Sequence, residues 1–352
     1  MRYSLFGESH GPAIGIVLQG VPSGLVLDMD FIAAEMARRA PGKSPLATAR
    51  NEKDTVEIVS GAFEGRATGT PLCGLIHNTD MRSRDYAATR WLARPGHADF
   101  TANLRYKGFE DYRGGGHFSG RLTAPLVFAG AVAKLALRER GIEVLARIRQ
   151  VAGIEDAPLD LAAPDLDALR AAGKTPFPVI DSSRGEAMQE AILAARSEGD
   201  SVGGVIECFI AGMPAGVGSP DFDENVESYI ARHVFAVPAV KGVEFGAGFG
   251  FASMRGSEAN DVFLPGDGLR TRTNNNGGIN GGIANGMPIV FRVAVKPTPS
   301  ISQEQDTVDM QNGTAARLVI TGRHDPCILS RAVPVIEAAA ALAMCDIPGV
   351  LA

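Results

Sequence analysis

Four of the six histidines stand in short segments that also carry glycine, serine or arginine. They are His10 in GESHG, His97 in RPGHAD, His117 in GGGHFSGR and His324 in GRHDPC. An imidazole that titrates near neutral pH can give or take a proton in a cleft. Each one alone could equally hold a loop by an ordinary hydrogen bond. Together they predict proton-transfer chemistry, whereas His77 and His233 lack this setting and are predicted to be structural.

The segment FGESHG, residues 6–11, satisfies G-x-S-x-G, the pattern of a hydrolase nucleophile. That pattern requires a strand, a sharp turn and a helix in succession. Here Pro12 is followed by AIGIVL, an apolar β-branched run that indicates a strand. The flanking sequence therefore argues against a nucleophilic Ser9, and a purely structural turn is the alternative.

Arginine gathers in the same glycine-rich segments. The set comprises Arg38, Arg39, Arg82, Arg84, Arg94, Arg113, Arg121, Arg270, Arg272 and Arg323. Planar guanidinium groups match the paired oxygens of phosphate and carboxylate. Together with KPTPS at 296–300 and RGGGHFS at 113–119, they predict two anion-binding patches and two phosphorylated ligands, for example a cofactor and a substrate. For part of the set the alternative is solvated surface charge.

No spacing of residues favours a metal or a disulfide framework. No histidine pair has H-x-x-x-H spacing, so a catalytic metal is not predicted. The four cysteines are far apart and form no C-x-x-C pair: Cys73, Cys208, Cys327 and Cys345. They indicate reduced thiols in a cytoplasmic protein.

Composition sets the class of protein. The chain has 352 residues and a formal net charge of −6, which favours neither a nucleic-acid nor a membrane partner. Glycine is high, at 42 residues, which points to loops and close backbone approaches. The N-terminus has no apolar signal core, and no uninterrupted apolar run reaches the ~18 residues of a membrane helix. We therefore expect a cytoplasmic protein.

Strands and helices follow from apolar runs and from 3.6-residue periodicity. The predicted strands are 13–18, 55–60, 72–76, 204–211, 241–245 and 288–295, and the predicted helices are 122–140, 185–196 and 334–344. A further stretch ends at Arg39 and has Asp28 or Asp30 as a candidate N-cap. No G-x-G-x-x-G follows a strand, so a mixed α+β class is favoured over a Rossmann domain. Residues 157–178 are predicted to form a variable surface insertion.

Signature blocks along almost the whole chain resemble those of the chorismate synthase family. In order, they are GESHG, RRAPGKS, SGAFEGRATGTP, NTDMRSRDY, RPGHAD, DYRGGG, PAVKGVEFG, RGSEAND, NGGINGGIANG, KPTPS and GRHDPCI. The resemblance implies one α+β domain spanning 1–352, a β-α-β sandwich that assembles into a homotetramer. It also implies the last step of the shikimate pathway, conversion of 5-enolpyruvylshikimate 3-phosphate to chorismate and phosphate with reduced FMN.

The resemblance assigns roles to the chemistry-bearing residues. His10 matches the proton donor to the leaving phosphate, with Ser9 in its relay, so Ser9 is not a nucleophile. His97 matches the histidine that keeps reduced flavin protonated, and Asp325 matches a carboxylate that works with flavin N5, with Ser119 beside them. The implied flavin contacts are His117, Phe118, Ser119, Pro238, Ala239, Gly281, Lys296, Pro297, Thr298, Pro299, Ser300 and Arg323.

Substrate and nucleotide contacts carry over onto Arg38, Arg39, Lys43 and Arg121. The chain departs from the family pattern where an Arg and a Ser become His117 and Phe118, and where S-R becomes Ser44-Pro45. No added reductase domain fits in this length, so a separate flavin reductase is favoured over direct reduction by NADPH. The alternative from another class is a catalytically silent protein that binds phosphorylated ligands.

Overall fold

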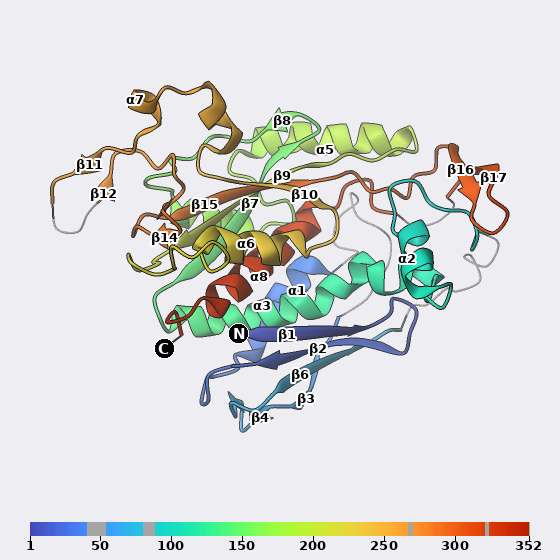
Figure 1. The fold of residues 1–352 in the computed structure, drawn as a ribbon, viewed down its shortest axis with the longest axis horizontal. Coiled ribbons are helices and arrows are strands. Elements are labelled where there is room, and N and C mark those ends of the chain that lie inside the picture. Colours follow the sequence, from blue (N-terminus) through green and yellow to red (C-terminus); the bar gives the residue numbers. More distant parts are fainter. Residues whose placement is uncertain (41–53, 80–88, 267–269, 321–323, 352) are drawn as a thin grey trace.

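Two antiparallel sheets enclose a layer of helices (Figure 1). The computed structural model describes residues 1–40, 54–79, 89–266, 270–320 and 324–351. The first sheet has the order β1-β2-β6-β3. Its strands are β1 (Arg2–Gly7), β2 (Ala13–Gln19), β6 (Leu72–His77) and β3 (Glu57–Ser60). The α+β class predicted from the sequence is confirmed.

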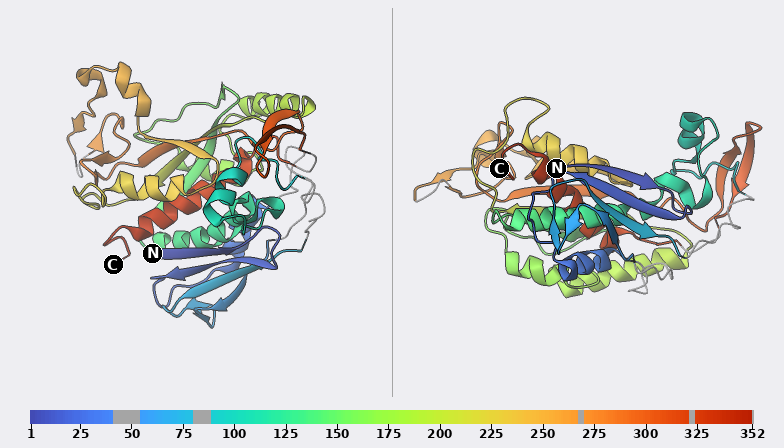
Figure 2. Two further views of the ribbon diagram at one scale, coloured as in Figure 1. Left: turned by 45° about the vertical axis from the view of Figure 1, so that its right-hand side comes forward. Right: turned by 90° about the horizontal axis from the view of Figure 1, so that it is seen from below.

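The second sheet lies on the other side of the helices and has the order β10-β15-β9-β7-β8 (Figure 2). Its strands are β10 (Val240–Phe245), β15 (Ile289–Val295), β9 (Gly204–Ala211), β7 (Glu143–Val151) and β8 (Ile154–Glu155). Two helices, α4 (Leu166–Gly173) and α5 (Ser182–Ser197), pack against β7 on its outer side. Helix α4 lies within the predicted insertion, where Leu169 packs with Phe209 and Val290.

Three helices form the middle layer: α1 (Met29–Arg39), α3 (Thr123–Arg138) and α8 (Leu329–Asp346). Helix α3 is buried from Ala124 to Leu137 because it is covered on both sides. Gly130 lets α3 approach α8 closely, since a Cβ there would stand 2.2 Å from Cβ of Ala338. The segment Gly120–Arg138 is long and apolar enough to cross a membrane, but 89% of its most apolar 18-residue window is buried inside the protein, as expected of a core helix.

Most predicted elements are confirmed. The six predicted strands appear as β2, β3, β6, β9, β10 and β15, and the predicted helices 122–140 and 185–196 appear as α3 and α5. Asp28 caps α1 and accepts a hydrogen bond from the N–H of Phe31 at 3.0 Å. The predicted start of the C-terminal helix at Pro334 is wrong. Helix α8 begins at Leu329, and burial of Leu329 and Val333 holds its first turns despite the proline.

Smaller elements lie at the two ends of the sandwich (Figure 1). Helix α2 (Asp99–Tyr106) and the hairpin of β16 (Gln305–Asp309) and β17 (Thr314–Leu318) lie at one end. The opposite end carries α7 (Gly256–Ala259), β11 (Phe263–Leu264), β12 (Arg270–Thr271), β13 (Ile279–Asn280) and β14 (Ile283–Ala284). The remaining elements are α6 (Val226–Phe235), which packs against α8 and β10, and the hairpin of β4 (Ala62–Phe63) and β5 (Arg66–Ala67).

Candidate active site

A glycine turn brings two of the predicted catalytic histidines together. The 3-10 segment Arg113–Phe118 carries three consecutive glycines with φ of 59°, 82° and 52°. A Cβ at Gly114 would lie 2.5 Å from Nε2 of His10, and one at Gly115 would lie 3.3 Å from Nε2 of His97. Only glycine provides both the positive φ and the empty space at these positions. The GGG sequence therefore places two imidazoles against one turn.

The loop between β1 and β2 carries Ser9 and His10, whose residues are only 5% and 6% exposed. The Ser9 N–H donates to the carbonyl of Gly116 at 3.1 Å, which ties this loop to the glycine turn. Asn78 holds the loop from the other side through its Nδ2, which donates to the carbonyl of Gly11 at 2.8 Å. Because a strand follows the loop, the strand-turn-helix context of a hydrolase nucleophile is missing, as the sequence predicts.

Two buried arginines, Arg39 and Arg121, share the carboxylate of Asp54. Arg39 donates to Asp54 Oδ2 at 2.7 Å, and Arg121 donates to Asp54 Oδ1 and, at 3.1 Å, to Asn78 Oδ1. Burial, reinforced by the neighbouring Arg331 charge, lowers the pKa of Arg39 to about 10, which still leaves it charged at neutral pH. Both arginines are thus positioned inside the protein and support the loop that carries His10.

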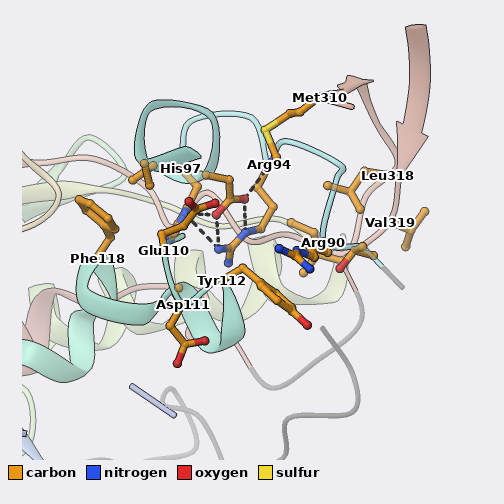
Figure 3. A pocket seen from close by; sticks show the side chains of 16 residues that line it. Arg90, Arg94, His97, Glu110, Asp111, Tyr112, Phe118, Met310, Leu318 and Val319 are labelled. Atoms are coloured by element: carbon orange, nitrogen blue, oxygen red, sulfur yellow. Dashed lines mark hydrogen bonds and ion pairs between the residues drawn. The ribbon is translucent and has the colours of Figure 1, made fainter. Parts of the chain in front are cut away.

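His97 lies at the start of α2 in a contact with Asp99 and Arg94 (Figure 3). Its Nδ1 is 2.8 Å from Oδ1 of Asp99, and Asp99 also accepts from Nε and NH2 of Arg94 at 2.7 and 2.6 Å. The three side chains line a small cleft of about 60 Å³ together with Tyr112 and Phe118. A cleft of this volume holds about two water molecules and no ring system, so a larger ligand requires its walls to move.

The KPTPS segment lies beside the loop that carries His97. Lys296 Nζ donates to the carbonyl of Gly96, and the Lys296 N–H donates to the carbonyl of Ala239 at 3.0 Å. Ala239 holds a positive φ of 74°, a rare conformation for a residue with a side chain. Thr298 Oγ1 is buried and has no hydrogen-bond partner among the described residues. Pro238, Ala239 and 296–300 therefore form one surface next to His97.

Asp325 pairs with an arginine of α8. Arg331 donates from NH1 to Asp325 Oδ2 at 2.5 Å and from Nε to the carbonyl of Arg39 at 3.0 Å. Arg331 thus links Asp325 to the C-terminal end of α1. Residues 201 and 202 contact both the segment after Asp325 and KPTPS. Val202 donates its N–H to the Pro326 carbonyl, and the Ser201 hydroxyl donates to the Thr298 carbonyl.

The three residues that follow the glycines, His117, Phe118 and Ser119, make different contacts. His117 Nδ1 donates to the carbonyl of Gly7 at 2.9 Å, and its ring meets Phe118 edge to face. Ser119 Oγ accepts from the N–H of Arg121 at 3.3 Å. His117, where the chain departs from the family pattern, therefore ties the turn to the last residue of β1.

Some predicted site residues lie elsewhere. Gly281 is at the tip of the β13–β14 hairpin, at the opposite end of the molecule from α2 (Figure 1). Arg38 points away from Arg39 and pairs with Glu337 and Glu35. Lys43 and Arg323 lie outside the described residues.

Four supporting residues have no role in the sequence interpretation. They are Asp99, Asp54, Asn78 and Arg331. Asp99 has a visible signal, because it follows His97 by two residues in RPGHAD. Asp54 and Asn78 have none, since their partners are distant in sequence. Among the residues described, no group of three histidine, cysteine or acidic side chains could hold a metal ion.

Comparison with known proteins decides the family. The family model for chorismate synthase matches residues 1–348. The chain belongs to the chorismate synthase family. Chorismate synthase of Dehalococcoides mccartyi is 47% identical over 350 residues, covering 97% of this chain and 93% of its own. That of Methanosarcina mazei is 47% identical over 346 residues, covering 98% and 93%.

A solved structure agrees with these relatives. A crystal structure of chorismate synthase matches with a TM-score of 0.78 at 30% identity, covering 98% of this chain and 90% of its own. The protein is therefore an enzyme of the chorismate synthase type, a lyase acting on phosphate bonds in aromatic amino acid biosynthesis. The resemblance stated from the signature blocks is confirmed.

The chemistry of the site fits a flavin phosphate cofactor of the kind this family implies. The buried hydroxyl of Thr298 lacks a partner among the described residues, and Lys296 supplies a cation close to it in sequence. The glycines of the turn let the imidazoles of His10 and His97 pack directly against its backbone. Donor groups and a cation on one surface suit the oxygens of a phosphate.

Proposed function

We propose that this enzyme converts 5-enolpyruvylshikimate 3-phosphate to chorismate and phosphate by a trans-1,4-elimination that depends on reduced FMN. The C–O bond to phosphate and one ring C–H bond break, and a second ring double bond forms. The observation that carries the proposal is that His10 and His97 meet the same glycine turn. Two separately held proton-transfer groups at one site suit a reaction in which an anion leaves from one part and a hydrogen from another.

His10 delivers a proton to an oxygen of the departing phosphate, and Ser9 connects His10 to the proton supply. Both residues are almost fully buried, so bulk water does not compete for that proton. Arg39 and Arg121 hold the loop that carries His10 through Asp54 and Asn78. Their guanidinium groups also add positive charge close to an anionic substrate.

We assign the flavin site to the surface beside His97. His117, Phe118, Ser119, Pro238, Ala239 and residues 296–300 would hold the cofactor, with Arg323 as a further predicted contact. Gly281 of the same chain lies at the other end of the molecule and is not part of this surface. When bound, reduced flavin supplies the electron that promotes loss of phosphate and accepts the hydrogen from the ring. His97 keeps a proton at the cofactor face, and Asp325, held by Arg331, provides a carboxylate at the same site.

The remaining assignments follow from the family. The enzyme works as a cytoplasmic homotetramer and receives reduced flavin from a separate reductase or through NADPH. Neither a nucleic acid nor a membrane is a partner. The chain forms one catalytic domain.

Anaerobic turnover tests the proposal. The purified enzyme is mixed with photoreduced FMN and 5-enolpyruvylshikimate 3-phosphate, and chorismate formation is followed by absorbance while phosphate release is measured in parallel. Equal amounts of chorismate and phosphate are expected. Binding of both ligands without either product would support the silent binding protein instead. Labelling of Ser9 by a fluorophosphonate would support the hydrolase.

A further inference from the structure

The contact between His97 and Asp99 defines which imidazole nitrogen carries the proton. The carboxylate oxygen of Asp99 lies 2.8 Å from Nδ1 of His97 and can only accept a hydrogen bond. Nδ1 must therefore carry a hydrogen, because a bare nitrogen lone pair facing a carboxylate at this distance is repulsive. NH2 of Arg94 is 3.0 Å from the same nitrogen and donates one of its two hydrogens to Asp99 at 2.6 Å, but the shorter contact of Nδ1 is the one to the carboxylate oxygen.

We infer that Asp99 is a positioning residue that fixes His97 with its hydrogen on Nδ1 and directs Nε2 toward the glycine turn. Nε2 is the nitrogen that a Cβ at Gly115 would approach to 3.3 Å. It is therefore the group presented to whatever binds beside the turn. The catalytic part of this inference rests on the proposed function, whereas the position of the hydrogen does not.

Arg94 holds Asp99 in the orientation that this role requires. Its Nε and its backbone N–H both donate to Oδ2, at 2.7 and 3.1 Å, while NH2 donates to Oδ1. Asp99 is also the first residue of α2, where a negative charge is favoured by the helix dipole. Burial alone would raise the pKa of the Asp99 carboxyl, but hydrogen bonds from Arg94 and His97 hold it well below its usual range. The carboxylate therefore stays ionised throughout the working pH range.

The substitution Asp99→Asn makes a specific structural prediction. Two donors of Arg94 face the Oδ2 position and one faces the Oδ1 position, so the amide oxygen of asparagine is favoured at Oδ2. The amide NH2 then occupies the Oδ1 position and faces Nδ1 of His97. A donor at that point selects the other tautomer, with Nδ1 bare and the hydrogen on Nε2. The variant is expected to bind FMN within a few-fold of the parent enzyme.

The test is the 15N spectrum of histidine-labelled protein, with the His97 signals identified by their loss in His97→Gln. In the parent enzyme at a pH where His97 is neutral, we expect Nδ1 to be protonated and Nε2 bare. In Asp99→Asn we expect the reverse, with a fall of about 10²- to 10⁴-fold in the single-turnover rate. A parent enzyme with its hydrogen on Nε2 would overturn the inference without any variant.

Asp346→Asn is the matched control. Asp346 has the same side-chain exposure as Asp99, 18%, and also meets an arginine and a histidine, Arg232 at 2.5 Å and His233 at 3.8 Å. It lies outside the site, so we expect an unchanged rate and an unchanged His97 signal. Asp99→Glu retains the carboxylate and should restore the Nδ1 hydrogen and part of the rate. An Asp99→Asn variant with the parent tautomer and the parent rate would overturn the inference. If the tautomer switches in Asp99→Asn but the parent enzyme forms no chorismate, only the proposed function is refuted.

Discussion

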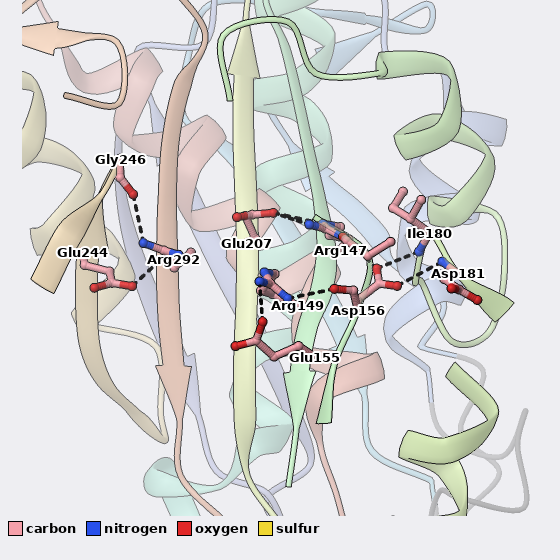
Figure 4. Close-up of polar contacts among 11 residues, drawn as sticks. Arg147, Arg149, Glu155, Asp156, Ile180, Asp181, Glu207, Glu244, Gly246 and Arg292 are labelled. Atoms are coloured by element: carbon pink, nitrogen blue, oxygen red, sulfur yellow. Dashed lines mark hydrogen bonds and ion pairs between the residues drawn. The ribbon is translucent and has the colours of Figure 1, made fainter. Parts of the chain in front are cut away.

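Two clusters in this molecule pair arginine with carboxylates. They differ in whether the ion pair also holds a titratable side chain. In the second sheet, Arg147 of β7 is fully buried and donates to Glu207 of β9 at 2.7 and 3.0 Å and to Asp156 at 2.6 Å (Figure 4). The oxygens of Asp156 also accept the N–H groups of Ile180 and Asp181. We call this the closed cluster, because in the described part of the chain its charged groups contact one another and the backbone.

Beside the glycine turn, Arg94 holds Asp99 in a similar bidentate pair, but the pair in turn holds a histidine whose second nitrogen faces the glycine turn. The same chemistry therefore serves two purposes. In the closed cluster it joins two strands to the segment that leads into α5. At the turn it orients a titratable group. Substitutions should consequently lower stability at the first cluster and rate at the second.

The largest expected effect is on rate. His10→Ala and His97→Ala should each lower the single-turnover rate about 10²- to 10⁴-fold, the usual contribution of a positioned proton donor or acceptor. Both variants should still bind flavin, because neither imidazole is needed to form the KPTPS surface. Rapid-mixing measurements under anaerobic conditions would determine the rates.

The other histidines provide the controls for that experiment. His77 is on an exposed strand end and meets Glu57, and His233 Nδ1 donates to the carbonyl of Tyr229 within its own helix. Alanine at either position should leave the rate within a few-fold. A loss of less than ten-fold for His10→Ala or His97→Ala would return that histidine to a structural role and weaken the contrast between the two clusters.

The closed cluster should show the opposite response. Arg147→Ala leaves the carboxylates of Glu207 and Asp156 buried without their cation, so we expect the free energy of unfolding to fall by about 3–5 kcal/mol. The rate per folded molecule should not change. Arg149→Ala, two residues along the same strand, removes a pair with the exposed Glu155 and one hydrogen bond to the Asp156 carbonyl, and should cost about 1–2 kcal/mol. Equal losses in urea titrations of the two variants would contradict this difference.

A third charged cluster, formed by Glu337, Arg38 and Lys134 in the helix layer, predicts how the free energy of unfolding depends on pH. Burial would raise the pKa of Glu337, but Arg38 and Lys134 outweigh it and lower the pKa to about 2. The unfolded chain binds this proton near pH 4.5, so the stabilisation is present above that pH and is lost as pH falls from about 4.5 toward 2. Its size is on the order of 3 kcal/mol. Glu337→Gln should be less stable at pH 7 and show a shallower loss of stability in this window, measured by denaturant titration at each pH.

The sequence predicts the frame of the fold well where burial is continuous. Strands such as β9 and β15 are largely apolar runs, and α3 is apolar over most of its surface, with Lys134 as its one buried charge. Strand β7 is not predicted, because Arg147 and Arg149 make it look polar although Arg147 is buried in an ion pair. Strand β1 is missed for a related reason, since it is an edge strand with alternating partial exposure.

The residues of the site also fall into two groups, those that local motifs predict and those that depend on contacts between distant parts of the chain. Motifs with local spacing, GESHG, RPGHAD and the glycine turn, identify His10 and His97, and the structure brings them to one turn. The carboxylate of Asp54 and the amide of Asn78 could not be predicted, because their roles depend on contacts across 67 residues of chain between Asp54 and Arg121 and between Asn78 and Gly11. Local patterns carry no information about such pairings.

The smallest expected effect concerns how the two ligands bind together. The cleft beside His97 has a volume of only about 60 Å³, so flavin must move its walls in order to enter. The proposed substrate is an anion that can hold the same arginine-bearing loops in place, and the second ligand to bind then has less ordering left to do. We therefore expect substrate to tighten oxidised FMN by about 5- to 150-fold, a coupling of about 1–3 kcal/mol. FMN fluorescence titrations with and without substrate measure this factor, and linkage requires FMN to tighten substrate by the same factor. Equal FMN affinities in the two titrations would contradict this coupling. They would mean that the cluster of Arg94, Asp99 and His97 is as rigid as the closed cluster around Arg147.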